Sequence, residues 1–169
     1  MGTRMIALAP SLVLVLALTA GISVPSSAHE PRTMFDGVWR TLEVVVPGPA
    51  GRTFKPGATL AIFHGRHYSR IEVHAEEPRP PLVDQATASA DELRAVWGPF
   101  VGEAGTFELS GNNTITMTAT VAKNPAAMKP GASNVFTYQR DGDLLTLTQV
   151  RSHGGPSRNP ITIKLTRID

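Results

Sequence analysis

Residues 134–150 read NVFTYQRDGDLLTLTQV, and this stretch decides the fold. Two runs of alternating apolar and polar residues flank a central Asp141-Gly142 pair. Alternation with a period of two is typical of β-strands with one buried face, and Asp-Gly is a preferred pair for a tight hairpin turn. The stretch therefore predicts two antiparallel strands, over residues 134–140 and 143–150.

The same arrangement recurs along the chain. Short connections carrying Gly or Asn also occur at residues 63–66 (FHGR) and 110–113 (SGNN), and the connections between these hairpins are long. In an up-and-down barrel every second connection lies at the same end, so the short turns would close one end and the long loops would surround the other. We expect an all-β, eight-stranded antiparallel up-and-down β-barrel with strands over residues 37–46, 58–63, 67–74, 105–110, 114–122, 134–140, 143–150 and 161–167.

One short helix is expected in the longest loop, between strands three and four. Ser89 is followed three residues later by Glu92, which is the spacing of a capping box. Leu93 and Trp97 fall on one side of this helix, and Gly98-Pro99 ends it. A helix with an apolar stripe in this position would pack against the barrel or fold over its mouth.

The first 28 residues have the pattern of a secretory signal peptide. Arg4 precedes an apolar run over residues 5–24, and the small residues Ser26-Ser27-Ala28 suit cleavage after Ala28. An uncleaved membrane anchor is the alternative, because the run approaches the length that spans a bilayer. We expect an exported protein, periplasmic or secreted, with no stable membrane span after cleavage. Its parts would be a signal peptide (1–28), an N-terminal lead-in (29–36) and the barrel domain (37–169).

Composition narrows the function classes. The chain has 16 Lys and Arg against 14 Asp and Glu, without a clustered basic surface or a row of stacking aromatic residues, so we expect no nucleic-acid partner. It has no cysteine, so its stability must come from the core. The histidines form no three-ligand set and no phosphate-binding loop occurs, so neither a metal nor another cofactor is expected.

The two ends of the predicted barrel carry residues that belong together. Gly37-Val38-Trp39 opens the first strand, and Arg167 ends the last strand on the same face as Ile163 and Leu165. The first and last strands of a closed barrel are neighbours, so the Arg167 guanidinium would stack on the Trp39 ring and seal that end. Trp39 and Arg167 are therefore expected to be structural residues.

With this Gly-x-Trp start and late Arg, the chain resembles the lipocalins and, more closely, the lipocalin-like proteins exported by bacteria. Four further stretches resemble that group: HYS at 67–69, VWGPF at 96–100, AKNP at 122–125 and LLTLT at 144–148. The resemblance implies a calycin-type antiparallel barrel that often carries a small apolar ligand.

The predicted function is to bind or carry a small, mostly apolar molecule inside the barrel. Three of the four long loops contain only basic charged residues, which would favour an anionic head group on an amphipathic ligand, although the acidic fourth loop could neutralise them. These basic residues are Arg52, Lys55, Lys123, Lys129, Arg151 and Arg158. The candidate ligand-binding residues are Trp39, Tyr68, Arg70, Trp97, Met117, Lys123, Phe136, Tyr138 and Arg158.

The strand over residues 67–74 has two alternative orientations. We expect Ile71 and Val73 to face inward, so that Tyr68, Arg70, Glu72 and His74 form a solvated outer stripe. The opposite orientation would line the cavity with an acid, a base and an anion-binding group, as in an enzyme of the isomerase or cyclase kind. A third hypothesis is a structural or interaction barrel whose lumen is filled by side chains.

Overall fold

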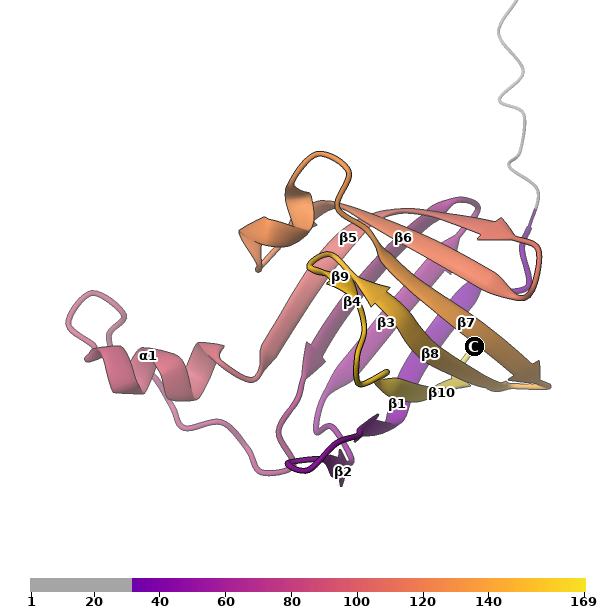
Figure 1. Ribbon diagram of the computed structural model, residues 1–169. Coiled ribbons are helices and arrows are strands. Elements are labelled where there is room, and N and C mark those ends of the chain that lie inside the picture. Colours follow the sequence, from indigo (N-terminus) through magenta and orange to yellow (C-terminus); the bar gives the residue numbers. More distant parts are fainter. Residues whose placement is uncertain (1–31) are drawn as a thin grey trace, which may run out of the picture.

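The computed structural model describes residues 32–169, and these residues form a closed all-β barrel with one short α-helix (Figure 1). The barrel strands pair antiparallel, and β10 pairs with both β1 and β8, which closes the sheet. They are β1 (Gly37–Val46), β3 (Thr59–His64), β4 (His67–Val73), β5 (Phe100–Ser110), β6 (Thr114–Ala122), β7 (Asn134–Asp141), β8 (Leu144–Ser152) and β10 (Thr162–Arg167). The expected signal peptide lies outside the described residues. Within residues 32–169, no helix is long and apolar enough to cross a membrane.

Short turns join the strands at one end of the barrel, and the long loops lie at the other (Figure 1). The turn between β5 and β6 contains Asn112 and Asn113, whose φ angles are 58° and 51°. Asn adopts this left-handed region more readily than most residues, which explains why it can replace Gly here. The long loops carry two short strands, β2 (Arg52–Phe54) and β9 (Gly155–Pro156), and a 3-10 helix, η1 (Pro125–Met128).

Helix α1 (Ala90–Trp97) differs from expectation in two ways. It lies between β4 and β5, not between the third and fourth strands in chain order, because the short strand β2 was not among the expected strands; the loop itself, after the strand at residues 67–73, is the expected one. It also projects away from the barrel instead of packing against it, and none of its residues is buried (Figure 1). The reason is that β5 begins at Phe100, where Phe100 pairs with Val73, so the sheet extends to the base of the helix.

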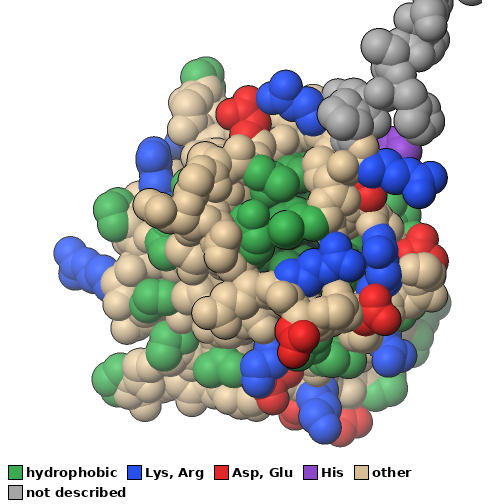
Figure 2. Space-filling view, turned by 90° about the vertical axis from the view of Figure 1, so that its right-hand side faces the viewer, with side chains coloured by type: hydrophobic (Ala, Val, Ile, Leu, Met, Phe, Trp, Pro, Cys, Tyr) green, Lys and Arg blue, Asp and Glu red, His purple; other side chains and the backbone are tan. Residues whose placement is uncertain are grey.

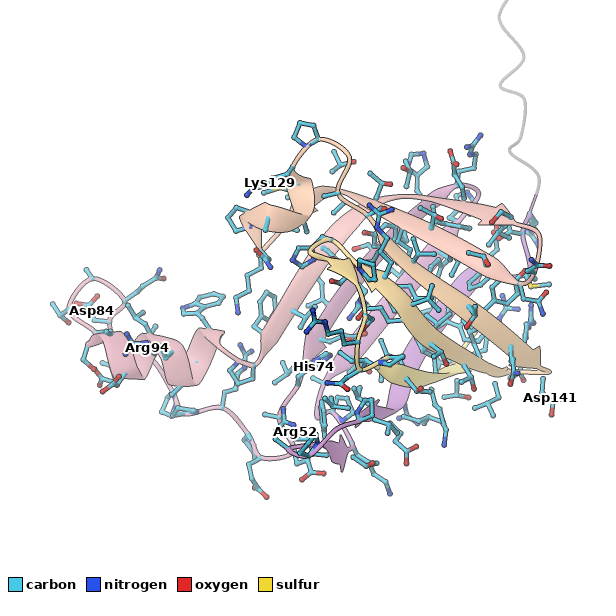
Figure 3. All side chains as sticks on the ribbon, viewed as in Figure 1. Arg52, His74, Asp84, Arg94, Lys129 and Asp141 are labelled. Carbon is cyan, nitrogen blue, oxygen red and sulfur yellow. The ribbon has the colours of Figure 1, made fainter. Side chains whose placement is uncertain are left out.

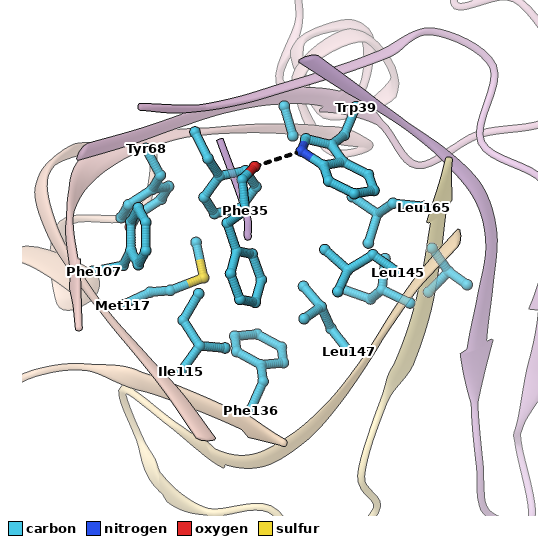
Figure 4. Packing of buried hydrophobic residues seen from close by; sticks show 14 of the residues in the cluster. Phe35, Trp39, Tyr68, Phe107, Ile115, Met117, Phe136, Leu145, Leu147 and Leu165 are labelled. Carbon is cyan, nitrogen blue, oxygen red and sulfur yellow. Dashed lines mark hydrogen bonds between the residues drawn. The ribbon is translucent and has the colours of Figure 1, made fainter. Parts of the chain in front are cut away.

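The core of the closed end is built around Trp39 and Phe35, which are 0% and 1% exposed (Figure 4). The Trp39 indole Nε1 donates a hydrogen bond of 2.8 Å to the Phe35 carbonyl oxygen. The Phe35 ring packs against Phe63 and Tyr138, with centroid distances of 5.4 and 5.0 Å. The end of the lead-in is therefore part of the core, because it inserts an aromatic side chain between the strands.

Arg167 covers the same end of the barrel. It lies opposite Trp39 in the pairing of β1 with β10, and its guanidinium carbon is 5.4 Å from the centroid of the Trp39 ring. Gly37 lies below it with φ of +141°, and a Cβ on this residue would lie 2.3 Å from an Arg167 nitrogen. Glycine suits this position because its positive φ would strain a larger residue and because a side chain here would displace the guanidinium. Figure 2 looks onto this end, where hydrophobic side chains gather at the centre with Lys and Arg side chains beside them.

Replacing Trp39 by Ala should lower the free energy of unfolding by roughly 3 to 5 kcal/mol, as for other large buried aromatic side chains. The loss removes ring packing, the hydrogen bond to Phe35 and the contact with Arg167. Denaturant unfolding measures it. Trp97→Ala is the matched control, because Trp97 is 41% exposed on α1 and should change stability little. Equal stability of the two variants would contradict this account of the closed end.

Candidate functional site

The open half of the barrel is hollow. A cavity of about 720 Å³ lies between the strands and the long loops, within the range of roughly 300 to 1,000 Å³ typical of small-molecule sites. Much of its wall is apolar, from Val44, Phe54, Phe100, Phe136 and Ile163. Its polar wall is formed by Arg70, His74 and Glu103, and its mouth includes Arg52, Lys123, Asn124 and His153.

The polar wall exists because β4 has the orientation opposite to the one we expected. Glu72 is 1% exposed and Tyr68 3%, whereas Ile71 is 52% exposed. The expectation that Ile71 and Val73 face inward is therefore wrong. The pairing with β3 explains the result: Tyr68 lies opposite Phe63 and Arg70 opposite Ala61, and residues directly opposite each other share a face. Since Phe63 and Ala61 are buried in the core, their partners on β4 must also face inward.

Glu72 is the centre of a buried ionic network. Its Oε1 accepts a hydrogen bond of 3.1 Å from the Thr41 hydroxyl of β1. Its Oε2 accepts a hydrogen bond of 3.2 Å from the Arg70 guanidinium and lies 2.5 Å from His74 Nε2. Arg70 also lies 3.5 Å from Glu103 Oε1 of β5. Three barrel strands are therefore linked through one carboxylate and one guanidinium.

The network fixes the charges of its members. Burial alone would raise the pKa of Glu72, but the Arg70 guanidinium and the hydrogen bonds from His74 and Thr41 lower that pKa to about 2. Burial likewise opposes the charged form of Arg70, yet Glu72 and Glu103 raise its pKa. Burial and the negative charge of Glu103 raise the pKa of Tyr68, so its hydroxyl keeps its proton. Behind the wall residue Arg70, whose charge is fixed, the network therefore holds a buried carboxylate at Glu72 and a neutral phenol at Tyr68.

Two buried donors in this region have no hydrogen-bond partner among residues 32–169: the Tyr68 hydroxyl and Arg70 Nε. Leaving a buried donor unpaired costs about 1 to 3 kcal/mol. The hydrogen bonds of the network are therefore concentrated around Glu72. On the side toward Tyr68, two donors are left that could bind a further acceptor.

The candidate ligand-binding residues are divided between the cavity and the core. Arg70, Lys123 and Phe136 line the cavity. Tyr68, Met117 and Trp39 are buried in the core cluster, and Tyr138 is packed against it. Trp97 on the projecting α1 and Arg158 in the loop before β10 are exposed and lie outside the cavity lining.

The basic residues of the long loops do not form a ring of free charges around the mouth. All six are exposed, but only Arg52 and Lys123 line the cavity. Lys123 Nζ donates to the carbonyl oxygens of Trp97, Gly98 and Phe100, so its charge holds the C-terminal end of α1. Arg52 lies over the Phe54 ring, 4.5 Å from its centroid, at the open end near His74 (Figure 3). Arg94 and Asp84 lie on the projecting segment, away from the cavity (Figure 3).

Sequence reasoning missed Glu103 as a site residue, because the strand that carries it was expected to begin at Gly105. It considered Glu72 and His74 only in the alternative orientation of their strand. The signal was present, since Tyr68, Arg70, Glu72 and His74 recur with the period of two that places them on one face of a strand. Within residues 32–169, no group of three or more potential metal ligands is placed to hold an ion.

Comparison with known proteins adds little. No family model matches the chain. No curated protein matches it either. Among solved structures, a redesigned β-barrel is similar with a TM-score of 0.41 and 13% sequence identity, covering 80% of this chain and 92% of that chain. The resemblance to lipocalin-like proteins therefore stays a prediction.

The buried network should make stability depend on acid pH. The pKa of Glu72 is about 2 in the folded chain against an ordinary 4.5, so its contribution is complete above about pH 4.5 and is lost as the pH falls toward 2. Between about pH 5 and pH 2, the wild-type protein should lose on the order of 3 kcal/mol more stability than Glu72→Gln, which has no carboxylate to protonate. Denaturant unfolding at each pH measures the difference.

The control for this experiment is Glu108→Gln. Glu108 pairs with Arg66 at the surface, where both side chains are more than half exposed, and such pairs contribute at most about 1 kcal/mol.

At neutral pH, Glu72→Gln should lower the free energy of unfolding by roughly 3 to 5 kcal/mol because it leaves Arg70 buried beside an uncharged amide. Parallel pH profiles for the wild type and Glu72→Gln would contradict the proposed charge state of Glu72.

Proposed function

We propose that this chain binds or carries a small, mostly apolar molecule in the open half of the barrel. The cavity of about 720 Å³, with an apolar wall, is the observation that supports this function. The closed half is packed by side chains, whereas the open half is not, so a barrel with a fully filled lumen fits the geometry less well. Burial of apolar ligand surface, at about 25 cal/mol per Å², would supply most of the affinity.

We also propose that the chain is an exported, lipocalin-like protein with the up-and-down strand order of that group. The signal-peptide pattern over residues 1–28 supports export. The contact of Arg167 with Trp39, and the close approach of that guanidinium to Gly37, support the lipocalin-like assignment because they involve the residues on which the resemblance depends.

The head group of the ligand meets a mixed environment. Arg52 is the basic side chain at the mouth whose charge is not committed to backbone carbonyls, whereas the deeper wall carries Arg70 and the carboxylate of Glu103, with the buried Glu72 paired to Arg70. A contact between an anion and a wet rim cation is worth on the order of 1 kcal/mol in water. We therefore expect an anionic head group to add at most a small increment to the affinity of an apolar tail.

Titration with N-phenyl-1-naphthylamine, an uncharged apolar dye that brightens when it leaves water, tests the binding site. Val46 lines the cavity, and its neighbour Val45 lies outside the lining. Val46→Trp should weaken dye binding by about tenfold or more by filling the cavity, whereas Val45→Trp should leave it unchanged. Circular dichroism of both variants checks that they fold. Dye binding that is not saturable, or that is equally weak in both variants, would contradict the proposed site.

Displacement of the dye by matched long-chain ligands measures the head-group preference. The alcohol and the carboxylic acid of one chain length should compete with affinities that differ by about tenfold or less. Arg52→Gln should remove any advantage of the acid. A much larger preference for the acid that survives this substitution would show that the head group binds elsewhere than at the mouth.

A further inference from the structure

The Glu72–His74 pair has the geometry of a proton-transfer site. His74 lines the cavity, and its Nε2 lies 2.5 Å from Oε2 of the buried Glu72 carboxylate. We propose that His74, oriented by Glu72, is a general base for proton transfer on a small, mostly apolar carbonyl compound bound in the barrel. This proposal depends on the proposed binding function, because the substrate must enter the same cavity.

The surroundings of His74 select one tautomer. Since an ionised carboxylate can only accept, the bond to Glu72 places a hydrogen on His74 Nε2, and in the neutral ring this tautomer leaves the lone pair on Nδ1. Nδ1 makes no hydrogen bond to another residue in the range 32–169. The ring is also fixed by an edge contact with Phe54, at a centroid distance of 5.7 Å. The side chain of His74 is 23% exposed and the side chain of Glu72 is 2% exposed, so the accessible part of the pair is the histidine.

Arg70 places a positive charge beside this base. Its guanidinium nitrogen and His74 Nε2 contact the same oxygen of Glu72, at 3.2 and 2.5 Å, and both residues line the cavity. When a base removes a proton from the carbon next to a carbonyl, negative charge moves to the carbonyl oxygen. Arg70 is the cation of the cavity wall on this side; its charge is shared with Glu72 and Glu103, and its Nε, which has no hydrogen-bond partner among residues 32–169, is the donor left for that oxygen.

The step needs no other reactant. His74 Nδ1 takes the proton, the C–H bonding pair forms a carbon–carbon double bond, and the carbonyl pair moves to oxygen beside Arg70. Return of the same proton from Nδ1 to a different carbon of the conjugated system moves the double bond and restores the carbonyl. The substrate class is therefore a small unsaturated ketone or aldehyde that undergoes a 1,3 proton shift, and nothing is oxidised or reduced.

The base can be tested without knowing the substrate, by using 5-nitrobenzisoxazole as the probe. A base removes the proton on its C3, the C–H pair forms the nitrile triple bond, and the N–O bond breaks to give a coloured phenolate. The wild-type protein should convert this probe with saturation kinetics, well above free imidazole at the same concentration. His74→Gln should lower the rate by a factor of about 100 while dye affinity stays unchanged.

His67→Gln is the matched control. His67 is an exposed histidine that lies opposite His64 at the short turn between β3 and β4, outside the cavity lining. This variant should keep the wild-type rate. Glu72 acts as a positioning residue, so Glu72→Gln should lower kcat with little change in KM. Val46→Trp should abolish the reaction by blocking access, which separates conversion in the cavity from conversion at the surface.

The outcomes for binding and for catalysis are separable. Displacement of the dye by 5-nitrobenzisoxazole without conversion would overturn the catalytic proposal and leave the binding function intact. Failure of both the dye and the probe to bind would overturn the binding function itself. Conversion that is equal in the wild type and His74→Gln, or that is lost equally in His67→Gln, would show that His74 is not the base.

Discussion

Burial of the Glu72 carboxylate is the constraint on which the open half of the barrel depends. Moving a carboxylate out of water costs several kcal/mol, and the cost is offset only where charged and hydrogen-bonding partners surround it. Here the partners come from Thr41 on β1 and from Arg70 and His74 beside Glu72 on the chain, while Glu103 on β5 holds the far side of Arg70. Hydrogen bonds and ion pairs therefore link the strands that form the polar wall of the cavity. Because these contacts are directional, they hold the strands in place without filling the space next to them with side chains.

The closed half uses the opposite principle. Trp39, Phe35, Phe63 and Phe107 fill it with aromatic side chains, and the Arg167 guanidinium covers the Trp39 ring. Dense packing of this kind supplies most of the stability of a domain without disulfides. Because the closed half is dense, the open half does not need a filled interior to keep the strands together.

Much of the fold could be predicted from local sequence, because tight turns depend on a few residues. The Asp-Gly and Asn-Asn hairpins have the backbone conformations that these residues favour.

The orientation of β4 could not be predicted in this way. A period of two identifies two faces but does not say which one is buried, and both Ile71 with Val73 and Tyr68 with Glu72 satisfied it. The register against Ala61 and Phe63 decided the orientation, and register is a property of two strands. Likewise, the capping box of α1 predicted the helix but not its direction, to which the contacts of Lys123 with the carbonyls at its C-terminal end contribute.

The separation of a packed half from a hollow half also has an evolutionary consequence. At the closed end, Arg167 contacts both Gly37 and the Trp39 ring, so the three residues constrain one another. A substitution of one of them therefore lowers the stability of the fold. Residues such as Val46, Ala122 and Gln149 line a space in which side chains of other sizes fit. Substitutions among the cavity-lining residues can therefore change the shape of the binding site in related barrels, while the residues of the closed end maintain the fold.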